Sequence, residues 1–339
     1  MRRAQLAADG ALLFVTAVWG ATFVMVQDAV TGFPVFAFLA LRFSLATLLL
    51  LPWFLRSSQP AVNHVLAGGA GTVEDRPDLN SRSGRSLRDG SQSPTVPGWH
   101  TRWIALWPGI AIGLALAAGY AFQTFGLRFT TPAKAGFITG LSVALVPIGQ
   151  AIFLRRAPRL NSIAGVALAT LGLGLLSLNA DLRVNLGDLL VLGCAVAFAA
   201  HILLVGRFAP DWNPLRLAFV QIATVAVVTA ILALIFERPI GWPPPNVWFA
   251  AAFTGLFATA LAFFIQSRAQ QATTPTHTAL IFAAEPVFAG IFSYLLIGEV
   301  LGPRQIAGAA LIVAGMLVAE LWRRNRDQYP VISYQSTDR

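Results

Sequence analysis

Apolar residues occur along this chain in long runs, which are separated mostly by short polar connections. Because a helix of about 20 apolar residues crosses the hydrocarbon core of a bilayer, each long run predicts one membrane-spanning helix. Several runs begin at a proline, where a missing backbone N–H costs a helix least. Ten spans are predicted on this basis: Ala11–Val30, Pro34–Leu55, Ile104–Phe125, Pro132–Phe153, Leu160–Leu178, Gly187–Gly206, Leu215–Phe236, Val247–Gln266, Pro275–Ile297 and Pro303–Trp322. The expected fold class is all-α integral membrane.

The composition excludes several other classes of protein. Of the 339 residues, 56% are hydrophobic and only 12% are charged, which is about half the charged fraction of a soluble domain. The net charge of +9 does not indicate nucleic-acid binding, because no soluble domain is predicted that could carry a basic face. A single cysteine excludes an intramolecular disulfide, and the sequence holds neither a Walker A motif nor a histidine-rich metal motif. No metal or cofactor is therefore expected.

Charge and polarity outside the spans predict the topology. Residues 56–102 are rich in Ser, Gly, Arg and Asp, so this insertion is expected to be disordered. With ten spans, the insertion lies on the same side of the membrane as both termini and the tail 323–339. The other side receives only a few basic residues: Arg128, Lys134, Arg183, Arg238 and Arg304. The positive-inside rule therefore places both termini in the cytoplasm and the protein in the inner (plasma) membrane.

Two parts of the chain match one another at a constant separation of 143 positions. The clearest matches are Gln123 with Gln266, Thr130–Pro132 with Thr273–Pro275, and Ile163–Gly165 with Ile306–Gly308. We therefore expect two related five-helix units, residues 11–178 and 187–322. Because five is an odd number, the second unit enters the membrane from the opposite side. Such inverted repeats are a recurring plan of secondary transporters, in which two halves move about a central site.

Sequence motifs in the first two and last two predicted spans are similar to those of a known family. They are WGATFVMVQ, LALRFSLATLLLLP and AAEPVFAGIFSYLLIGEVLGPRQIAGAALIVAGMLVAE. On these motifs the chain resembles the EamA-type members of the drug/metabolite transporter superfamily. The resemblance implies a ten-helix inverted-repeat carrier that moves small metabolites, often amino acids or related compounds, and frequently outward. One departure is that the first-unit counterpart of Glu285-Pro286 is Ser142-Val143.

Two charged residues lie near the middle of predicted spans. Glu285 occurs in the ninth span beside Pro286, and Arg42 occurs in the second. A charge at that depth costs roughly 2.5–3.5 kcal/mol on insertion scales, so both side chains should face protein or water rather than lipid. The functional hypothesis is that Arg42 attracts a substrate carboxylate while Glu285 binds an amine or takes up a coupling proton. The structural alternative is a fixed ion pair that holds helices together.

Other candidates for the substrate site are polar or aromatic residues within the spans. Trp19 and Tyr120 could line a pocket, although aromatic residues in membrane helices also serve as packing groups and interface anchors. Gln123 and Gln266 could hydrogen-bond a substrate from the two units, or bridge helices. His277 is a candidate for proton coupling, because histidine titrates near neutral pH.

The repeat and the buried charges favour a secondary transporter, expected to be an exporter of small polar metabolites. An integral membrane enzyme acting on lipid would be expected to place paired carboxylates or histidines near one interface, and the sequence shows none. A non-transporting scaffold or sensor has no need of Arg42 and Glu285 in the bilayer centre. The expected partners are a small-molecule substrate and membrane lipid, without nucleic acid, and a homodimer is left open.

Overall fold

The computed structural model describes residues 2–57, 106–126, 129–130, 138–153, 155, 158, 160–177, 185–238, 240–298 and 302–326. All secondary structure in these ranges is helical. The elements are α1 (Arg2–Thr31), α2 (Val35–Arg56), α5 (Trp107–Gly126), α7 (Ser142–Phe153), α8 (Leu160–Ser177), α9 (Leu186–Phe208), η2 (Ala209–Asp211), α10 (Pro214–Phe236), α11 (Pro245–Gly255), η3 (Leu256–Leu261), α12 (Ala262–Ala269), α13 (Pro275–Phe282), α14 (Glu285–Ile297) and α15 (Pro303–Arg326).

The lengths and hydropathies of these helices fit a membrane protein. Five helical stretches among the described residues are long and apolar enough to cross a bilayer: Val35–Arg56, Trp107–Gly126, Leu186–Asp211, Pro214–Phe236 and Pro245–Ala269. Three further helices are apolar but shorter, at Ile138–Phe153, Leu160–Leu175 and Pro303–Ala319. Long aliphatic side chains such as Leu171, Ile235 and Leu317 are exposed on the outside of the bundle, as expected where lipid replaces water. The protein is therefore embedded in the membrane.

Several predicted boundaries differ from the observed ones. Helix α1 begins at Arg2 rather than Ala11, and α15 continues to Arg326, so the start of the predicted tail is helical. Most of the predicted disordered insertion, residues 58–102, lies outside the described residues.

The ninth predicted span is wrong in one respect, because it is not one continuous helix. Helix α13 ends at Phe282 and α14 begins at Glu285. Between them the backbone tightens, and the N–H of Ala284 bonds the carbonyl of Ile281 at 3.1 Å. The cause is Pro286, which lacks a backbone donor and whose ring crowds the preceding turn. Glu285 therefore lies at the N-terminus of a helix, where backbone N–H groups favour a negative charge.

A second irregularity occurs in the eighth predicted span. Helices α11 and α12 are joined by the π-helical segment η3, Leu256–Leu261, so Pro245–Ala269 forms one interrupted helix. A π-helical segment shifts the register of backbone hydrogen bonds and often occurs at functional sites. No pattern in the amino-acid sequence predicts this segment.

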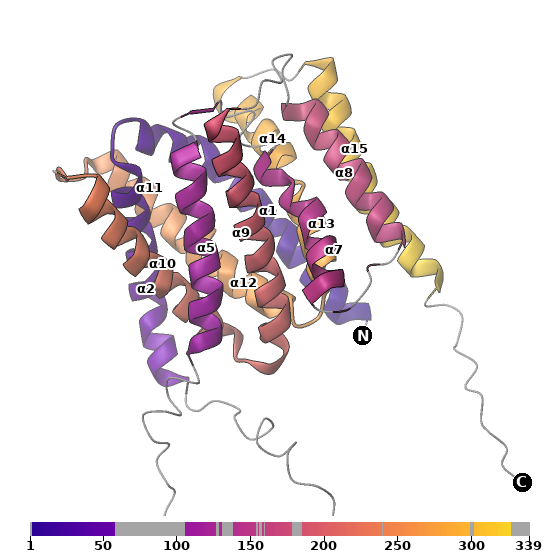
Figure 1. Cartoon of the computed structure of the whole chain (residues 1–339), viewed down its shortest axis with the longest axis horizontal. Coiled ribbons are helices and arrows are strands. Elements are labelled where there is room, and N and C mark those ends of the chain that lie inside the picture. Colours follow the sequence, from indigo (N-terminus) through magenta and orange to yellow (C-terminus); the bar gives the residue numbers. More distant parts are fainter. Residues whose placement is uncertain are drawn as a thin grey trace, which may run out of the picture.

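The most extensive helix–helix contacts join a helix of one predicted unit to a helix of the other. Figure 1 shows α8 lying along α15 and α5 beside α9, and α2 packs along α10. The contact of α5 with α9 has a counterpart in that of α12 with α1, and the contact of α7 with α9 has a counterpart in that of α14 with α1. The beginning of α1 and the end of α2 lie at one end of the bundle, here called the amino-terminal end, while α9 begins at the opposite end (Figure 1).

The crossing of α8 and α15 depends on glycines. A Cβ atom on Gly165 would lie 2.6 Å from the carbonyl oxygen of Gly315, and one on Gly172 would lie 2.5 Å from that of Gly308. In the 143-position register Gly165 corresponds to Gly308 and Gly172 to Gly315. Exchanging the two units would therefore convert one of these contacts into the other. Because the residue number rises in α8 while it falls in α15, these two helices run in opposite directions.

Replacing Gly165 by alanine is expected to destabilise the protein by about 1–3 kcal/mol, the usual cost of overpacking a tight contact. The midpoint of thermal unfolding in detergent should fall. Gly10→Ala is the matched control, because nothing lies within 4 Å of a Cβ there. Equal midpoints for the two variants would contradict the close crossing of α8 and α15.

An unusual cap fixes the start of α2. Pro34 precedes this helix and makes no side-chain cap. Instead the Glu237 carboxylate, just after α10, accepts hydrogen bonds from the N–H of Phe36 at 3.0 Å and of Ala37 at 2.9 Å. A carboxylate at a helix N-terminus satisfies free donors and complements the helix dipole. This cap ties α2 to the second unit two turns before Arg42.

Candidate functional site

Arg42 is buried in the centre of the bundle, with only 6% of its surface exposed. Its Nε donates to Oγ1 of Thr259 at 2.7 Å, and its Nη2 donates to the carbonyl oxygen of Ala258 at 3.1 Å. Both acceptors belong to the π-helical segment η3. A guanidinium carries five N–H donors, so two bonds hold the group in place and three donors have no hydrogen-bond partner among the described residues. Arg42 is thus positioned by the second unit and can still bind an anion.

The carbonyl of Ala258 joins three helices. Besides Arg42, it accepts a hydrogen bond from Nε1 of Trp19 at 2.9 Å. Trp19 lies on α1 and Arg42 on α2, so both N–H donors converge on the same oxygen of η3. The predicted site residues Trp19 and Arg42 are therefore brought together by a backbone group.

Aromatic rings pack next to Arg42, whose Cζ lies 5.6 Å from the centroid of the Phe43 ring. Phe43 makes an edge contact with Tyr120 at 5.4 Å between ring centroids, and Trp19 makes one with Phe282 at 4.9 Å. Phe43 and Phe263 are fully buried, whereas Trp19 and Tyr120 are only half-buried. Rings of this kind exclude water and strengthen electrostatic interactions near them. We call Trp19, Arg42, Tyr120 and Glu285 the central cluster.

Glu285 enters the central cluster from the break between α13 and α14. Its backbone packs closely against α1, since a Cβ on Gly20 would lie 3.0 Å from the Glu285 carbonyl oxygen. The side chain is half-buried, and in the described part of the chain no hydrogen bond or ion pair to its carboxylate forms. The carboxylate thus keeps its capacity to accept donors from a bound molecule.

Helix α1 brings the two charged members of the central cluster close together. Arg42 shares the Ala258 carbonyl with Trp19, and the next residue, Gly20, packs against the backbone of Glu285. Among the described residues, however, Arg42 and Glu285 do not form a direct ion pair; the acceptors of Arg42 are Thr259 and Ala258. The fixed ion pair considered from the sequence is therefore absent from this conformation. Arg42 of the first unit and Glu285 of the second therefore lie near each other without a direct contact between their side chains.

The two predicted glutamines lie outside this cluster of contacts. Gln123 on α5 donates from Nε2 to Oγ1 of Thr139 at 3.3 Å. Gln266 on α12 is buried and donates to Oε1 of Gln270 at 3.1 Å, while its own Oε1 has no partner among the described residues. The structure does not bring either amide into contact with Arg42 or Glu285. Their role in substrate binding stays a prediction.

His277 is also separate from the central cluster. It lies in the first turn of α13, and its Nε2 donates to Oδ1 of Asp9 at 3.0 Å. This contact joins α13 to the beginning of α1 at the amino-terminal end of the bundle. The predicted coupling of protons through His277 is not tested by this geometry.

Sequence reasoning missed the hydrogen-bond partners of several polar residues of the interior. Thr259 was not singled out, because a threonine in an apolar span gives no signal of its partner. A further network joins His201, Gln221 and Ser267: Nε2 of His201 lies 2.9 Å from Oε1 of Gln221, whose Nε2 donates to Ser267 at 3.3 Å. All three side chains are buried. Polar residues recurring in facing helices were the only available indication of such a network.

Comparisons with known proteins agree with this architecture. The model of the EamA-like transporter family matches residues 86–178 and 185–320, which is one match in each half of the chain. A solved crystal structure has the same fold: its TM-score is 0.69 at 19% sequence identity, and the match covers 96% of this chain and 99% of that chain.

Curated relatives are named as transporters. An uncharacterized transporter of Archaeoglobus fulgidus is 31% identical over 317 residues, covering 94% of this chain and 87% of that protein. The uncharacterized transporter YyaM of Bacillus subtilis is 26% identical, covering 62% of this chain and 72% of YyaM. The threonine/homoserine exporter RhtA of Escherichia coli is 31% identical over 206 residues, covering 56% of this chain and 65% of RhtA. The chain belongs to the EamA-like transporter family, and it is a membrane-embedded transporter of the drug/metabolite transporter superfamily.

Proposed function

We propose that the protein exports amino acids, or compounds like them, from the cytoplasm by alternating access. The substrate would bind at the central cluster, between two inverted five-helix units. The observation that carries this proposal is that Arg42 and Glu285 lie on either side of Trp19–Gly20 of α1 without a direct ion pair among the described residues.

The zwitterion of an amino acid complements this arrangement. Its carboxylate can accept the free N–H donors of Arg42, and the fork of a guanidinium suits a carboxylate well. Its ammonium group can donate to the Glu285 carboxylate, which keeps its acceptor capacity in this conformation. Half-buried Trp19 and Tyr120 offer apolar surface for the remainder of the molecule. The name of the relative RhtA points to the same class of substrate.

Alternating access requires two halves that can exchange conformations. The crossing of α8 and α15 supports such a symmetry, since its two glycine contacts interchange when the units are exchanged. An axis that exchanges two antiparallel helices lies perpendicular to both, and hence in the plane of the membrane. This supports the inverted arrangement of ten helices that the sequence predicts.

The charge distribution and a relative support the proposed orientation and direction. The excess of arginine on the side of both termini favours a cytoplasmic location for them, in the inner membrane. The exporter RhtA supports outward movement of the substrate.

Counterflow in reconstituted liposomes tests the proposal. Vesicles loaded with unlabelled threonine or homoserine should take up labelled threonine faster than vesicles without protein. A panel of other amino acids, sugars and organic cations defines the substrate class. The proposal is contradicted if folded protein exchanges none of the amino acids, or exchanges sugars or cations instead.

A further inference from the structure

A second internal register extends the repeat to the first two helices of each unit. At a separation of 179 positions, Trp19 corresponds to Phe198 and Arg42 to Gln221. The packing agrees: Trp19 contacts Phe263 at 5.9 Å between centroids, and Phe198 contacts Tyr120, the 143-position counterpart of Phe263, at 5.6 Å. In this register Asp9 of α1 corresponds to Asp188 of α9.

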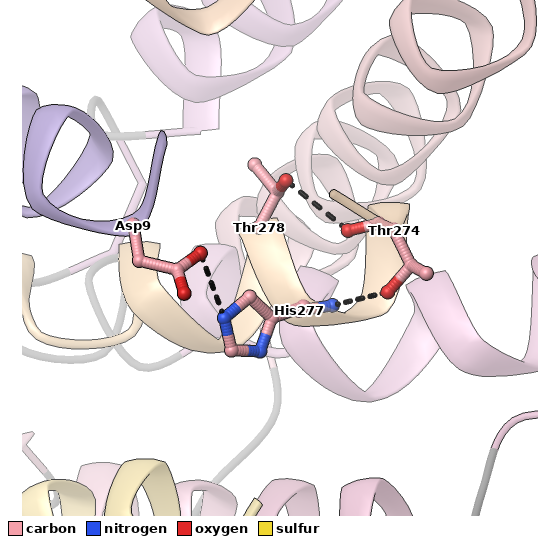
Figure 2. Close-up of polar contacts among 4 residues, drawn as sticks. All are labelled: Asp9, Thr274, His277 and Thr278. Atoms are coloured by element: carbon pink, nitrogen blue, oxygen red, sulfur yellow. Dashed lines mark hydrogen bonds and ion pairs between the residues drawn. The ribbon is translucent and has the colours of Figure 1, made fainter. Parts of the chain in front are cut away.

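Asp9 binds the second unit at the amino-terminal end of the bundle. Figure 2 shows its carboxylate accepting a hydrogen bond from His277, at 3.0 Å. The two side chains are 18% and 12% exposed, so the contact is largely shielded from solvent. Thr274 holds His277 in place, since its Oγ1 accepts the N–H of His277 at 3.3 Å and its carbonyl accepts the hydroxyl of Thr278 at 3.2 Å (Figure 2).

Asp188 makes the corresponding contact at the opposite end. Its Oδ1 accepts a hydrogen bond from the hydroxyl of Thr130, which follows α5 in the first unit. Thr130 is the 143-position counterpart of Thr273, which directly precedes Thr274. Each aspartate, in the N-terminal part of a unit's first helix, therefore contacts the region where the fourth span of the other unit begins.

The two ends nevertheless differ in detail. At the opposite end, the backbone of Gly187 packs tightly, because a Cβ there would lie 2.6 Å from the carbonyl oxygen of Gly126. At the amino-terminal end, the hydroxyl of Thr273 is buried without a hydrogen-bond partner among the described residues. Asp9 bonds His277 in its place. The two ends therefore make related contacts through different partner side chains.

We propose that Asp9–His277 and Asp188–Thr130 are the two gates of the transport cycle, one at each end of the bundle. The inference rests on the proposed alternating-access function. Each contact joins the first helix of one unit to the region where the fourth span of the other begins, so separating the units at one end must break it. The remaining contact then keeps the other end closed. Because the two contacts are related by the repeat, weakening them shifts the protein in opposite directions.

The single cysteine of the chain provides a reporter for this shift. Cys194 is buried on α9, with Sγ 3.8 Å from Oγ1 of Thr139. It follows Asp188 by six positions, about 9 Å along the helix axis, so it lies behind the Asp188 gate. A membrane-impermeant methanethiosulfonate should reach Cys194 only when that gate is open. Protein in lipid nanodiscs exposes both ends to the reagent and needs no assumption about membrane orientation.

Thr130→Val and Asp9→Ala are the informative variants. Thr130→Val removes the hydroxyl but keeps the shape, and it leaves intact the capping box in which Asp188 bonds Asn185. It should raise the initial rate of Cys194 labelling at least about threefold, given the modest net energy of one hydrogen bond to a charged group. Asp9→Ala should lower that rate by a similar factor, because it favours opening at the other end.

Two controls complete the experiment. Asp211→Ala removes an exposed carboxylate whose ion pair with Arg207 lies on the surface, and its labelling rate should equal that of the wild type. Cys194→Ala measures background labelling. Shifts of opposite sign support the gates; unchanged rates, or shifts of the same sign, overturn them. Because labelling needs no substrate, its outcome is independent of the counterflow measurement that tests the proposed function.

Discussion

Replacing Arg42 by glutamine is expected to reduce threonine counterflow about 10- to 100-fold, because a buried hydrogen bond to a charged group contributes about 1.5–3 kcal/mol. Glutamine can keep a hydrogen bond to Thr259 or Ala258 but offers no positive charge to a substrate carboxylate. The rate of labelled threonine uptake into preloaded vesicles, at several external concentrations, measures the effect.

Arg207→Gln is the matched control for this change. Arg207 carries the same charge, but it is exposed and forms an ion pair with Asp211 four residues later on the surface. Its variant should transport at the wild-type rate. Size-exclusion profiles and thermal midpoints of both variants show whether the loss at Arg42 comes from unfolding. A folded Arg42→Gln protein with wild-type counterflow would contradict the role of Arg42.

Replacing Glu285 by glutamine is expected to cause a loss of the same order, about 10- to 100-fold, since the variant offers no negative charge to the substrate ammonium. The shape of the side chain and its place at the start of α14 are unchanged. Counterflow of labelled threonine measures this loss, and Asp211→Asn serves as the control for removing an exposed carboxylate.

The double variant separates this mechanism from a structural ion pair. If Arg42 and Glu285 only neutralised each other, removing both charges would restore stability and transport relative to each single variant. If they bind the two ends of one substrate, the double variant should transport no better than either single variant. Recovery of transport in the double variant would therefore favour the structural alternative.

Much of the helical architecture could be predicted from the apolar pattern. The predicted boundaries at Leu160, Phe236, Pro275 and Pro303 coincide with those of α8, α10, α13 and α15. Prolines and the ends of apolar runs give strong local signals, because their effect on a helix does not depend on neighbours. The break before Glu285 had such a signal in Pro286, yet the length of the apolar run favoured a single helix.

The candidate site was predictable only in part. Arg42 and Glu285 stood out because charge in an apolar span is costly, so their burial needs a cause. Their hydrogen-bond partners could not be predicted from the sequence. The Ala258 carbonyl belongs to the π-helical segment η3, which no sequence pattern predicts. Asp9 and His277 are 268 positions apart, and only the packing of α13 against α1 reveals their contact.

The central claim is that Arg42 and Glu285 recognise opposite ends of one zwitterion. Competition in the threonine counterflow assay tests it most directly, with threoninol lacking the carboxylate and 3-hydroxybutyrate lacking the ammonium group. In the wild type, both analogues should compete at least about tenfold less well than threonine, the loss expected for one charged hydrogen bond. Arg42→Gln should no longer distinguish threonine from threoninol, and Glu285→Gln should no longer distinguish threonine from 3-hydroxybutyrate. Unchanged discrimination by residual transport in both variants would contradict the claim.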